Sequence, residues 1–161
     1  MVRALAHTAV CVPDVEAAVE WYQRVLGLQV LAPPYRMEGK AIEDDMGELL
    51  PAPVVVTAAI MGFDVGDHVI EVIHYPNAPG AAQAERAITD TGISHIGLLC
   101  DDIAADKARL VAEGASALTS GTADVAGLQT TWIADPFGVT WILLQKGHDD
   151  RPYWHQYAPV R

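Results

Sequence analysis

The hydrophobic pattern of this chain contains one arrangement twice. An apolar run over residues 5–12 stops at Pro13-Asp14, and apolar side chains then recur at helical spacing over residues 15–26. The same order returns with an apolar run over residues 93–100 and a helical pattern from Asp102 to Val111. Nearly continuous apolar runs are typical of buried strands, and a spacing of three to four residues is typical of a helix on a sheet. The pattern therefore predicts a repeated strand–helix unit.

Three further strands are expected after each predicted helix. In the first half they cover residues 28–32, 53–61 and 68–75, and in the second half residues 115–118, 128–134 and 139–145. These stretches are rich in the β-branched and aromatic residues that strands favour. The order predicts an α+β fold built from two tandem βαβββ modules.

Breaks in the pattern predict loops. Pro33-Pro34 is expected to end the second strand, because proline cannot donate a hydrogen bond within a sheet. Residues 35–53 have no periodicity and are expected to form a long loop, for instance a lid over a pocket. Residues 119–126 are small and also predict a loop, and Asp135-Pro136-Phe137-Gly138 has the residue preferences of a type I turn.

A histidine occurs early in the first strand of each half, as His7 and His95. A lone histidine in a strand is usually a core residue, but two at matched positions of a repeat favour a shared site. In the strand at 68–75, Glu71 interrupts an apolar row. An unpaired buried carboxylate is costly, so Glu71 either binds a cation or faces water. These three residues are the candidates for chemistry.

Composition and charge restrict the classes of partner. The chain has 161 residues, about half of them apolar, which suits one globular domain or two small halves with a common core. Its formal net charge of −11 argues against nucleic acid and anionic membranes as partners. With no apolar run of spanning length and no signal-peptide pattern, we expect a cytoplasmic protein. Cys11 and Cys100 are too few for a disulfide framework and are expected to be reduced.

The paired strand–helix openings, their histidines and the turn at residues 135–138 resemble the vicinal oxygen chelate superfamily. That superfamily includes glyoxalase I, methylmalonyl-CoA epimerase, extradiol dioxygenases, fosfomycin-resistance proteins and bleomycin-binding proteins. The resemblance covers roughly residues 5–146 and implies that curved sheets form a cup around a divalent metal. It implies a single domain over residues 1–161, with module one at about 4–76, module two at about 92–146 and an aromatic tail at 147–161. It also implies a homodimer, in which the tail could take part.

The resemblance further implies the metal ligands. His7 and Glu71 match the first-strand and last-strand ligands of module one, and His95 matches the first-strand ligand of module two. Many relatives end module two with Asp-Pro-x-Gly-x-x-x-Glu, but this chain has Ile142 in place of the glutamate. Two imidazoles and one carboxylate suit Fe, Mn, Co, Ni or Zn and leave positions open for substrate. Glu71 would also be the base that moves a proton.

The nearest polar replacements for Ile142 are Thr140, whose hydroxyl is a weak ligand, and Gln145, which alternation places on the opposite face. Alternation also selects candidates for an apolar pocket wall, although a purely structural role is equally compatible with them. These wall candidates are Ala9, Cys11, Ile73, Tyr75, Gly97, Leu99, Thr140 and Ile142.

Three functions remain open at this point. The first is a metal-dependent lyase, isomerase or epimerase acting on a small substrate with adjacent oxygens. The second is a non-haem Fe(II) dioxygenase, because two histidines and one carboxylate form the triad that oxygen chemistry uses. The third, which Ile142 favours, is a metal-free protein that binds or sequesters a small molecule.

Overall fold

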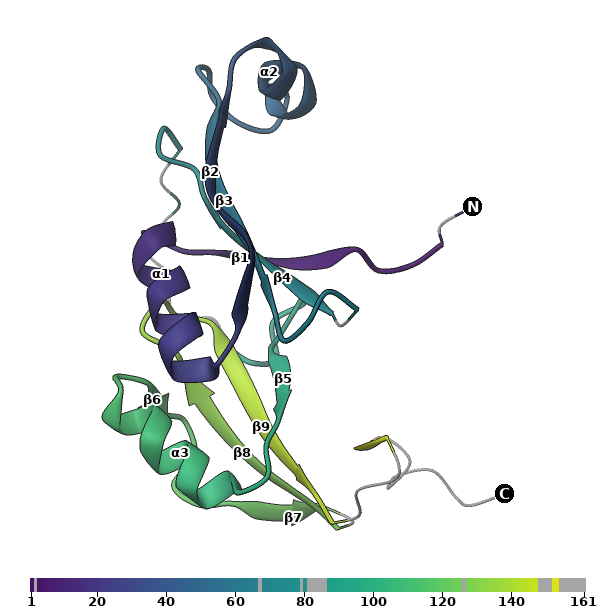
Figure 1. The fold of residues 1–161 in the computed structure, drawn as a ribbon, viewed down its shortest axis with the longest axis vertical. Helices are drawn as coiled ribbons and strands as arrows, with labels where there is room; N and C mark the ends of the chain where they lie inside the picture. The colour runs from purple at the N-terminus through teal and green to yellow at the C-terminus, as the bar shows by residue number, and fades with distance from the viewer. Residues whose placement is uncertain are drawn as a thin grey trace. The chain divides into compact units, whose positions relative to one another are not determined.

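The computed structural model describes residues 1, 3–66, 68–78, 80, 87–125, 127–147 and 152–153 (Figure 1). The chain divides into two compact units, Met1–Ala84 and Glu85–Arg161, and the division falls between the two predicted modules. Each unit is an α+β assembly with its own mixed sheet, as the sequence predicted. The predicted aromatic tail at 147–161 lies almost entirely outside the described residues. Among the described residues, no helix is long and apolar enough to span a membrane.

Unit 1 contains a four-stranded sheet in the order β1-β4-β3-β2. The edge strand β1 (His7–Cys11) runs parallel to β4 (Val69–His74), whereas β4 pairs antiparallel with β3 (Val55–Gly62), and β3 with β2 (Gln29–Glu38). The first predicted helix forms as α1 (Val15–Trp21) and continues as a π-helical turn, η1 (Tyr22–Leu26).

Helix α1 packs on β3 and β4 because its apolar stripe is continuous. It buries Val15, Ala18, Val19 and Trp21, and the Asp14 side chain caps its first turn by accepting a hydrogen bond from the Ala17 N–H at 2.9 Å. Gly27 ends η1 in the left-handed region with φ of 77°, a conformation that costs glycine little.

The expectation that Pro33-Pro34 ends the second strand is wrong. Strand β2 runs through both prolines to Glu38. It lies at the edge of the described sheet, where it pairs with β3, and its register shifts between Ala32 and Tyr35. Prolines are tolerated at edge strands and bulges, because the missing N–H need not complete a hydrogen-bonded ladder there.

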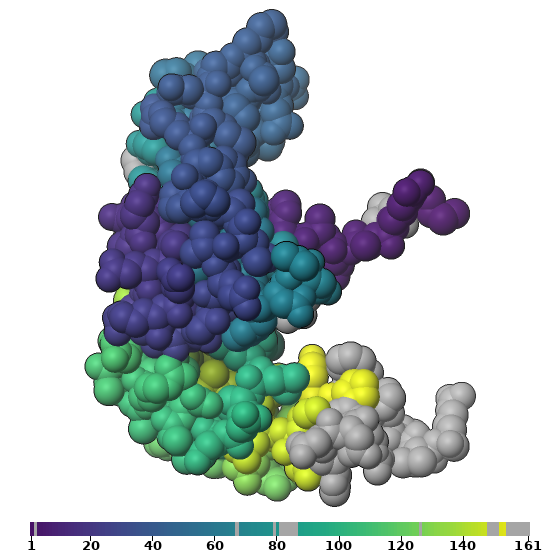
Figure 2. Space-filling view, in the orientation of Figure 1, coloured from purple at the N-terminus to yellow at the C-terminus, as the bar shows by residue number. Residues whose placement is uncertain are grey.

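The long loop expected over residues 35–53 is also wrong. After β2 the chain forms a short helix, α2 (Lys40–Met46), at one end of unit 1 (Figures 1 and 2). The Glu43 carboxylate accepts a hydrogen bond from the Val54 N–H at 2.7 Å, which ties the helix to the start of β3. The segment is held by packing against a core cluster in the sheet, and its contributing side chains are Ile42, Met46 and Leu50.

Unit 2 has a five-stranded sheet with the path β5-β9-β8-β6. Strand β5 (Ile96–Leu99) runs parallel to β9 (Thr140–Lys146), and β9 pairs antiparallel with β8 (Leu128–Ala134). Two short strands, β6 (Ser116–Ala117) and β7 (Ala123–Val125), pair with β8. Strand β7 corrects the prediction of a loop over 119–126.

Helix α3 (Ile103–Ala112) repeats the design of α1 in the second unit. The Asp102 side chain accepts a hydrogen bond from the Ala105 N–H at 3.0 Å, as Asp14 does for α1. Ile103 and Leu110 are buried and face the sheet side of the helix. The repeated strand–helix order predicted from the sequence is therefore confirmed, and an aspartate caps both helices.

Candidate functional site

In unit 1, His7 and Glu71 lie on the same face of the sheet. Strand pairing aligns Ala9 with Glu71, and His7 stands two residues before Ala9, so strand alternation directs all three side chains to one side. His7 Nε2 lies 3.3 Å from Glu71 Oε2, and 45% and 16% of the two side chains are exposed. Neighbouring ligands of a metal with bonds of about 2.1 Å are separated by about 3 Å. The two donor atoms therefore fit adjacent positions on one metal ion.

Glu71 is the negative centre of a group of ionisable side chains on this face. Burial raises the pKa of the Tyr35 phenol, and the charge of Glu71 and a hydrogen bond to its carboxylate raise it further. Partial burial raises the pKa of the Cys11 thiol, with a second contribution from Glu71. Burial likewise raises the pKa of Tyr75, and the nearby Cys11 and Glu71 raise it further. The cluster thus favours neutral phenols and a neutral thiol around one carboxylate.

Tyr35 is the site residue that the sequence reasoning missed. The sequence pattern predicts a loop from residue 35 onwards, whereas Tyr35 lies on β2, and Glu71 contributes to the raised pKa of its phenol. The register shift that brings it to this face depends on strand pairing, which local periodicity does not report.

In unit 2, His95 lies one residue before β5 and is exposed, rather than inside the strand as the sequence predicted. Its Nδ1 atom is 2.6 Å from the Ser94 hydroxyl oxygen. Its ring stands edge-on to Trp132, with 4.7 Å between the ring centroids and 76° between the planes. The contact with Ser94 engages Nδ1, so Nε2 is the nitrogen available to a ligand.

Strand register makes Ile142 the counterpart of Glu71. In unit 1 the parallel pair aligns Ala9 with Glu71, and in unit 2 it aligns Gly97 with Ile142. In each case the histidine stands two residues before the small residue. Gln145 is not a substitute ligand, because its side-chain oxygen accepts a hydrogen bond from the Ile103 N–H at 2.8 Å and so supports the start of α3.

The predicted wall residues divide into two sets, one in each unit. On unit 1, Ile73 is buried and belongs to the core cluster, and Tyr75 packs against that cluster. On unit 2, Leu99 is 56% exposed and Gly97 is exposed. Ala9, Cys11, Ile73 and Glu71 share a face by register, as do Gly97, Leu99, Thr140 and Ile142. Their roles as pocket walls stay predictions.

No three metal-binding side chains come together within the part of the chain that the structure describes. Unit 1 supplies a pair of donors, His7 and Glu71, and unit 2 supplies His95. The three-ligand set therefore stays a prediction that requires donors from both units.

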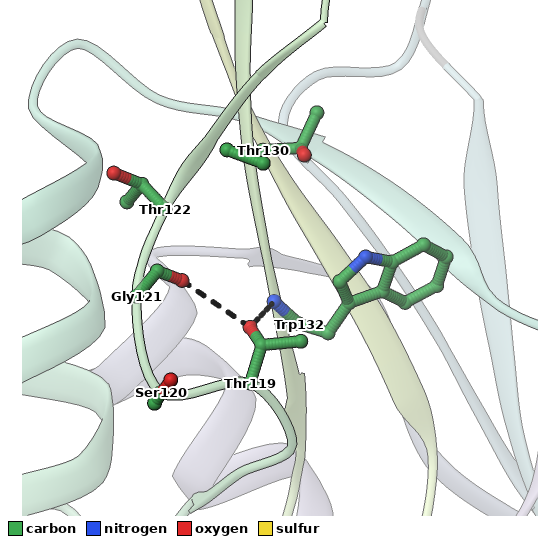
Figure 3. A pocket seen from close by; sticks show the side chains of 7 residues that line it. Thr119, Ser120, Gly121, Thr122, Thr130 and Trp132 are labelled. Carbon is green, nitrogen blue, oxygen red and sulfur yellow. Dashed lines mark hydrogen bonds between the residues drawn. The ribbon is translucent and has the colours of Figure 1, made fainter.

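A cavity of about 300 Å³ lies beside Trp132 on unit 2 (Figure 3). The Thr119 hydroxyl shapes the cavity. It accepts a hydrogen bond from the backbone N–H of Trp132 at 3.2 Å and donates one to the Gly121 carbonyl oxygen at 3.4 Å. The Lys107 ammonium group donates to the Thr119 and Gly121 carbonyl oxygens of the same loop. The cavity is lined by uncharged residues, namely Thr119, Ser120, Gly121, Thr122, Ala123, Thr130 and Trp132.

Comparison with known proteins gives both a family and a fold. The family model of the Glyoxalase/Bleomycin resistance protein/Dioxygenase superfamily matches residues 4–143. A glyoxalase family protein from Bacillus cereus has a similar structure, with a TM-score of 0.78 at 16% sequence identity, covering 90% of this chain and 95% of its own. No curated protein matches the sequence significantly.

Two glyoxalase I structures are also similar. The trypanothione-dependent enzyme of Leishmania major aligns with a TM-score of 0.59 at 19% identity, over 90% of this chain and 88% of its own. The Zea mays enzyme aligns with a TM-score of 0.61 at 18% identity, over 91% of this chain but only 46% of its own. At such identities the likeness establishes the fold.

Proposed function

Because this chain belongs to the Glyoxalase/Bleomycin resistance protein/Dioxygenase superfamily, as the resemblance in its sequence predicted, we propose that it is a metal-dependent lyase, isomerase or epimerase. Its substrate would be a small molecule with adjacent oxygen atoms. The observation that carries this proposal is the pair His7 and Glu71, whose donor atoms lie 3.3 Å apart on one face of the unit 1 sheet. Such a pair suits adjacent positions on a divalent ion.

In this proposal His7, Glu71 and His95 hold the metal, which would be Fe, Mn, Co, Ni or Zn. The bound metal would supply a Lewis acid that stabilises negative charge developing on a substrate oxygen. Glu71 would also act as the general base, since its side chain is 16% exposed and therefore accessible to a small molecule. Ser94 would orient the His95 ring through its contact with Nδ1.

The cavity beside Trp132 favours a substrate that has an uncharged part, which would bind to unit 2. Trp132 contacts the His95 ring and also lines the cavity, so a molecule bound at His95 would lie next to it. The lining side chains are uncharged hydroxyls, small residues and an indole.

We further propose a homodimer located in the cytoplasm, in line with the sequence-based expectations.

A second candidate function is metal-free binding of a small molecule. Ile142 favours it, because an apolar side chain stands where register with Glu71 would place a fourth ligand. A site with three ligands binds a metal less firmly than one with four. The two proposals differ in whether the purified protein retains metal.

Elemental analysis of purified wild type, His7→Ala, Glu71→Ala and His95→Ala tests the metal proposal. We expect about one divalent ion per chain in wild type and a clear loss in each of the three variants. His74→Ala is the matched control, because strand alternation places His74 on the opposite face of β4 from Glu71. Equal, substoichiometric metal in all five proteins would refute the proposal and leave the binding function.

Oxygen dependence then identifies the reaction class. A lyase or isomerase keeps its activity with Zn, Ni or Co under anaerobic conditions, whereas a dioxygenase requires Fe(II) and consumes oxygen. Oxygen uptake with a catechol-like substrate would replace the isomerase proposal by the dioxygenase.

A further inference from the structure

The cavity beside Trp132 exists because the strand pairing along β8 is interrupted. Strand β7 pairs with β8 as far as Thr130, and β6 resumes the pairing at Ile133. Residues 118–122 of the connecting segment therefore stand opposite only Thr131 and Trp132 of β8. The surplus chain leaves the ladder as a loop, and this loop and the Trp132 side chain line the cavity (Figure 3).

Hydrogen bonds from two elements hold the loop in place. The Gly121 carbonyl oxygen accepts from the Thr131 hydroxyl at 2.9 Å and from the Lys107 ammonium group at 3.4 Å. Thr131 lies on β8 and is 1% exposed, whereas Lys107 lies on α3. A wall that is already ordered loses little conformational freedom when a ligand binds, so the cavity is preorganised.

The size and the chemistry of the cavity favour an uncharged ring. A cavity of about 150 Å³ is large enough for benzene, so about 300 Å³ accommodates one ring with a short substituent. The Trp132 indole offers a flat surface on which an aromatic ring stacks favourably. Alternation places Thr130 on the same face of β8, and its hydroxyl and that of Thr122 can bond to a polar substituent. The residues that line the cavity are all uncharged, which disfavours a charged group there.

Trp132 connects this cavity to His95 within unit 2. The indole and imidazole rings stand edge-on to each other, with 4.7 Å between their centroids. A ligand that fills the cavity therefore lies beside the imidazole ring. A ring bound in the cavity and oxygen atoms bound at a metal on His95 can thus belong to one small molecule.

We propose that the substrate carries an uncharged aromatic ring next to its adjacent oxygen atoms, and that the cavity beside Trp132 binds this ring. The proposal rests on the proposed function and names its substrate class. Ketones with an aryl group and a neighbouring hydroxyl are the simplest members of this class. Trp132 thereby determines specificity, whereas the metal binds the oxygen atoms.

Two neutral probes that differ in the ring alone test the proposal. α-Hydroxyacetophenone and hydroxyacetone have the same adjacent oxygens, but the first carries a phenyl group where the second carries a methyl group. With a chelator present, ligand-observed NMR titrations measure the affinity of the metal-free protein for each probe. We expect α-hydroxyacetophenone to bind about tenfold more tightly, because its ring is buried against the indole. Equal affinities would overturn the proposal.

Ala123→Leu fills the cavity and leaves Trp132 and His95 unchanged. Ala123 lines the cavity and is exposed, so the chain should fold with the larger side chain. We expect the affinity for α-hydroxyacetophenone to fall about fivefold and that for hydroxyacetone to stay the same. Val125→Leu is the matched control, because Val125 lies on the same short strand outside the cavity lining, and it should bind both probes like wild type.

Trp132→Leu removes the indole and should cause a similar loss of affinity for the phenyl probe. A preference for the phenyl probe that persists unchanged in both Ala123→Leu and Trp132→Leu would overturn the proposal, since the ring would then bind elsewhere.

Co²⁺ separates this inference from the proposed function. If a metal binds at His95, Co²⁺ should strengthen the binding of both probes by a similar factor, because they offer the same oxygens. A preference for the phenyl probe that Ala123→Leu abolishes, without any effect of Co²⁺, supports the cavity assignment and refutes the metal function alone. A Co²⁺ effect without a preference for the phenyl probe retains the metal function and overturns this inference.

Discussion

Asp135 organises the turn before β9 through three hydrogen bonds. This buried carboxylate accepts from the Phe137 N–H, the Val139 N–H and the Trp141 indole N–H, each at 2.9 Å. Asp135→Asn replaces one acceptor oxygen by an NH₂ group, so one of these donors meets another donor. We expect the free energy of unfolding to fall by about 2–3 kcal/mol, measured by urea denaturation.

Asp124→Asn is the control for this change. Asp124 is also a turn carboxylate and accepts from the Gly127 N–H at 2.8 Å, but it is exposed to water. Its substitution should cost less than about 1 kcal/mol, since water can replace the lost interaction. Similar losses in Asp124→Asn and Asp135→Asn would contradict the role given to burial.

At the same scale, the sequence predicts individual site residues where a polar side chain occurs in an apolar strand. Glu71 is a candidate because a carboxylate interrupts an apolar strand, and His7 is one because it recurs as His95 in the repeat. The structure brings His7 and Glu71 within 3.3 Å of each other. The sequence does not predict Tyr35 as a site residue, because a tyrosine after two prolines conflicts with no local pattern and Glu71 lies two strands away.

The two aspartate caps act at the scale of the element. Asp102 accepts from the Ala105 N–H at the start of α3, whereas its neighbour Asp101 precedes the cap and is exposed. Asp102→Ala should lower the free energy of unfolding by about 1 kcal/mol, because it leaves a helix N–H without its acceptor. Asp101→Ala should change it by less than about 0.5 kcal/mol. Thermal or urea unfolding measures both, and equal effects would show that charge near the helix, rather than the cap, matters.

Helices α1 and α3 were predictable, whereas helix α2 and the full extent of the second strand were not, for a physical reason. The helical stripe and the cap of α1 and α3 are local features, readable within a dozen residues. The course of β2 depends on its place at the sheet edge, where Pro33-Pro34 is tolerated in a bulge. Helix α2 was missed because its seven residues include three acidic side chains and no clear apolar stripe, and its stability comes from packing on the sheet.

At the scale of the whole molecule, the predicted metal site needs ligands that neither unit supplies alone. The register of the parallel strand pairs is the same in both units, with Ala9 opposite Glu71 and Gly97 opposite Ile142. The predicted metal site combines donors from the two units. The sequence could propose that combination only through resemblance to a family, because periodicity within a module carries no information about its partner module.

Ile142→Glu would complete the symmetric ligand set. The side chain is partly exposed and stands opposite Gly97, so a carboxylate there can be hydrated or bound to a cation. If residue 142 faces the metal, the added charged ligand should raise the affinity for Co²⁺ about tenfold or more over wild type. Ile142→Gln is the control, since it has the same length without the charge, and it should remain near the wild-type affinity. Equal Co²⁺ affinities for the Glu and Gln variants, measured by calorimetry, would place Ile142 away from the metal and favour the small-molecule binding function.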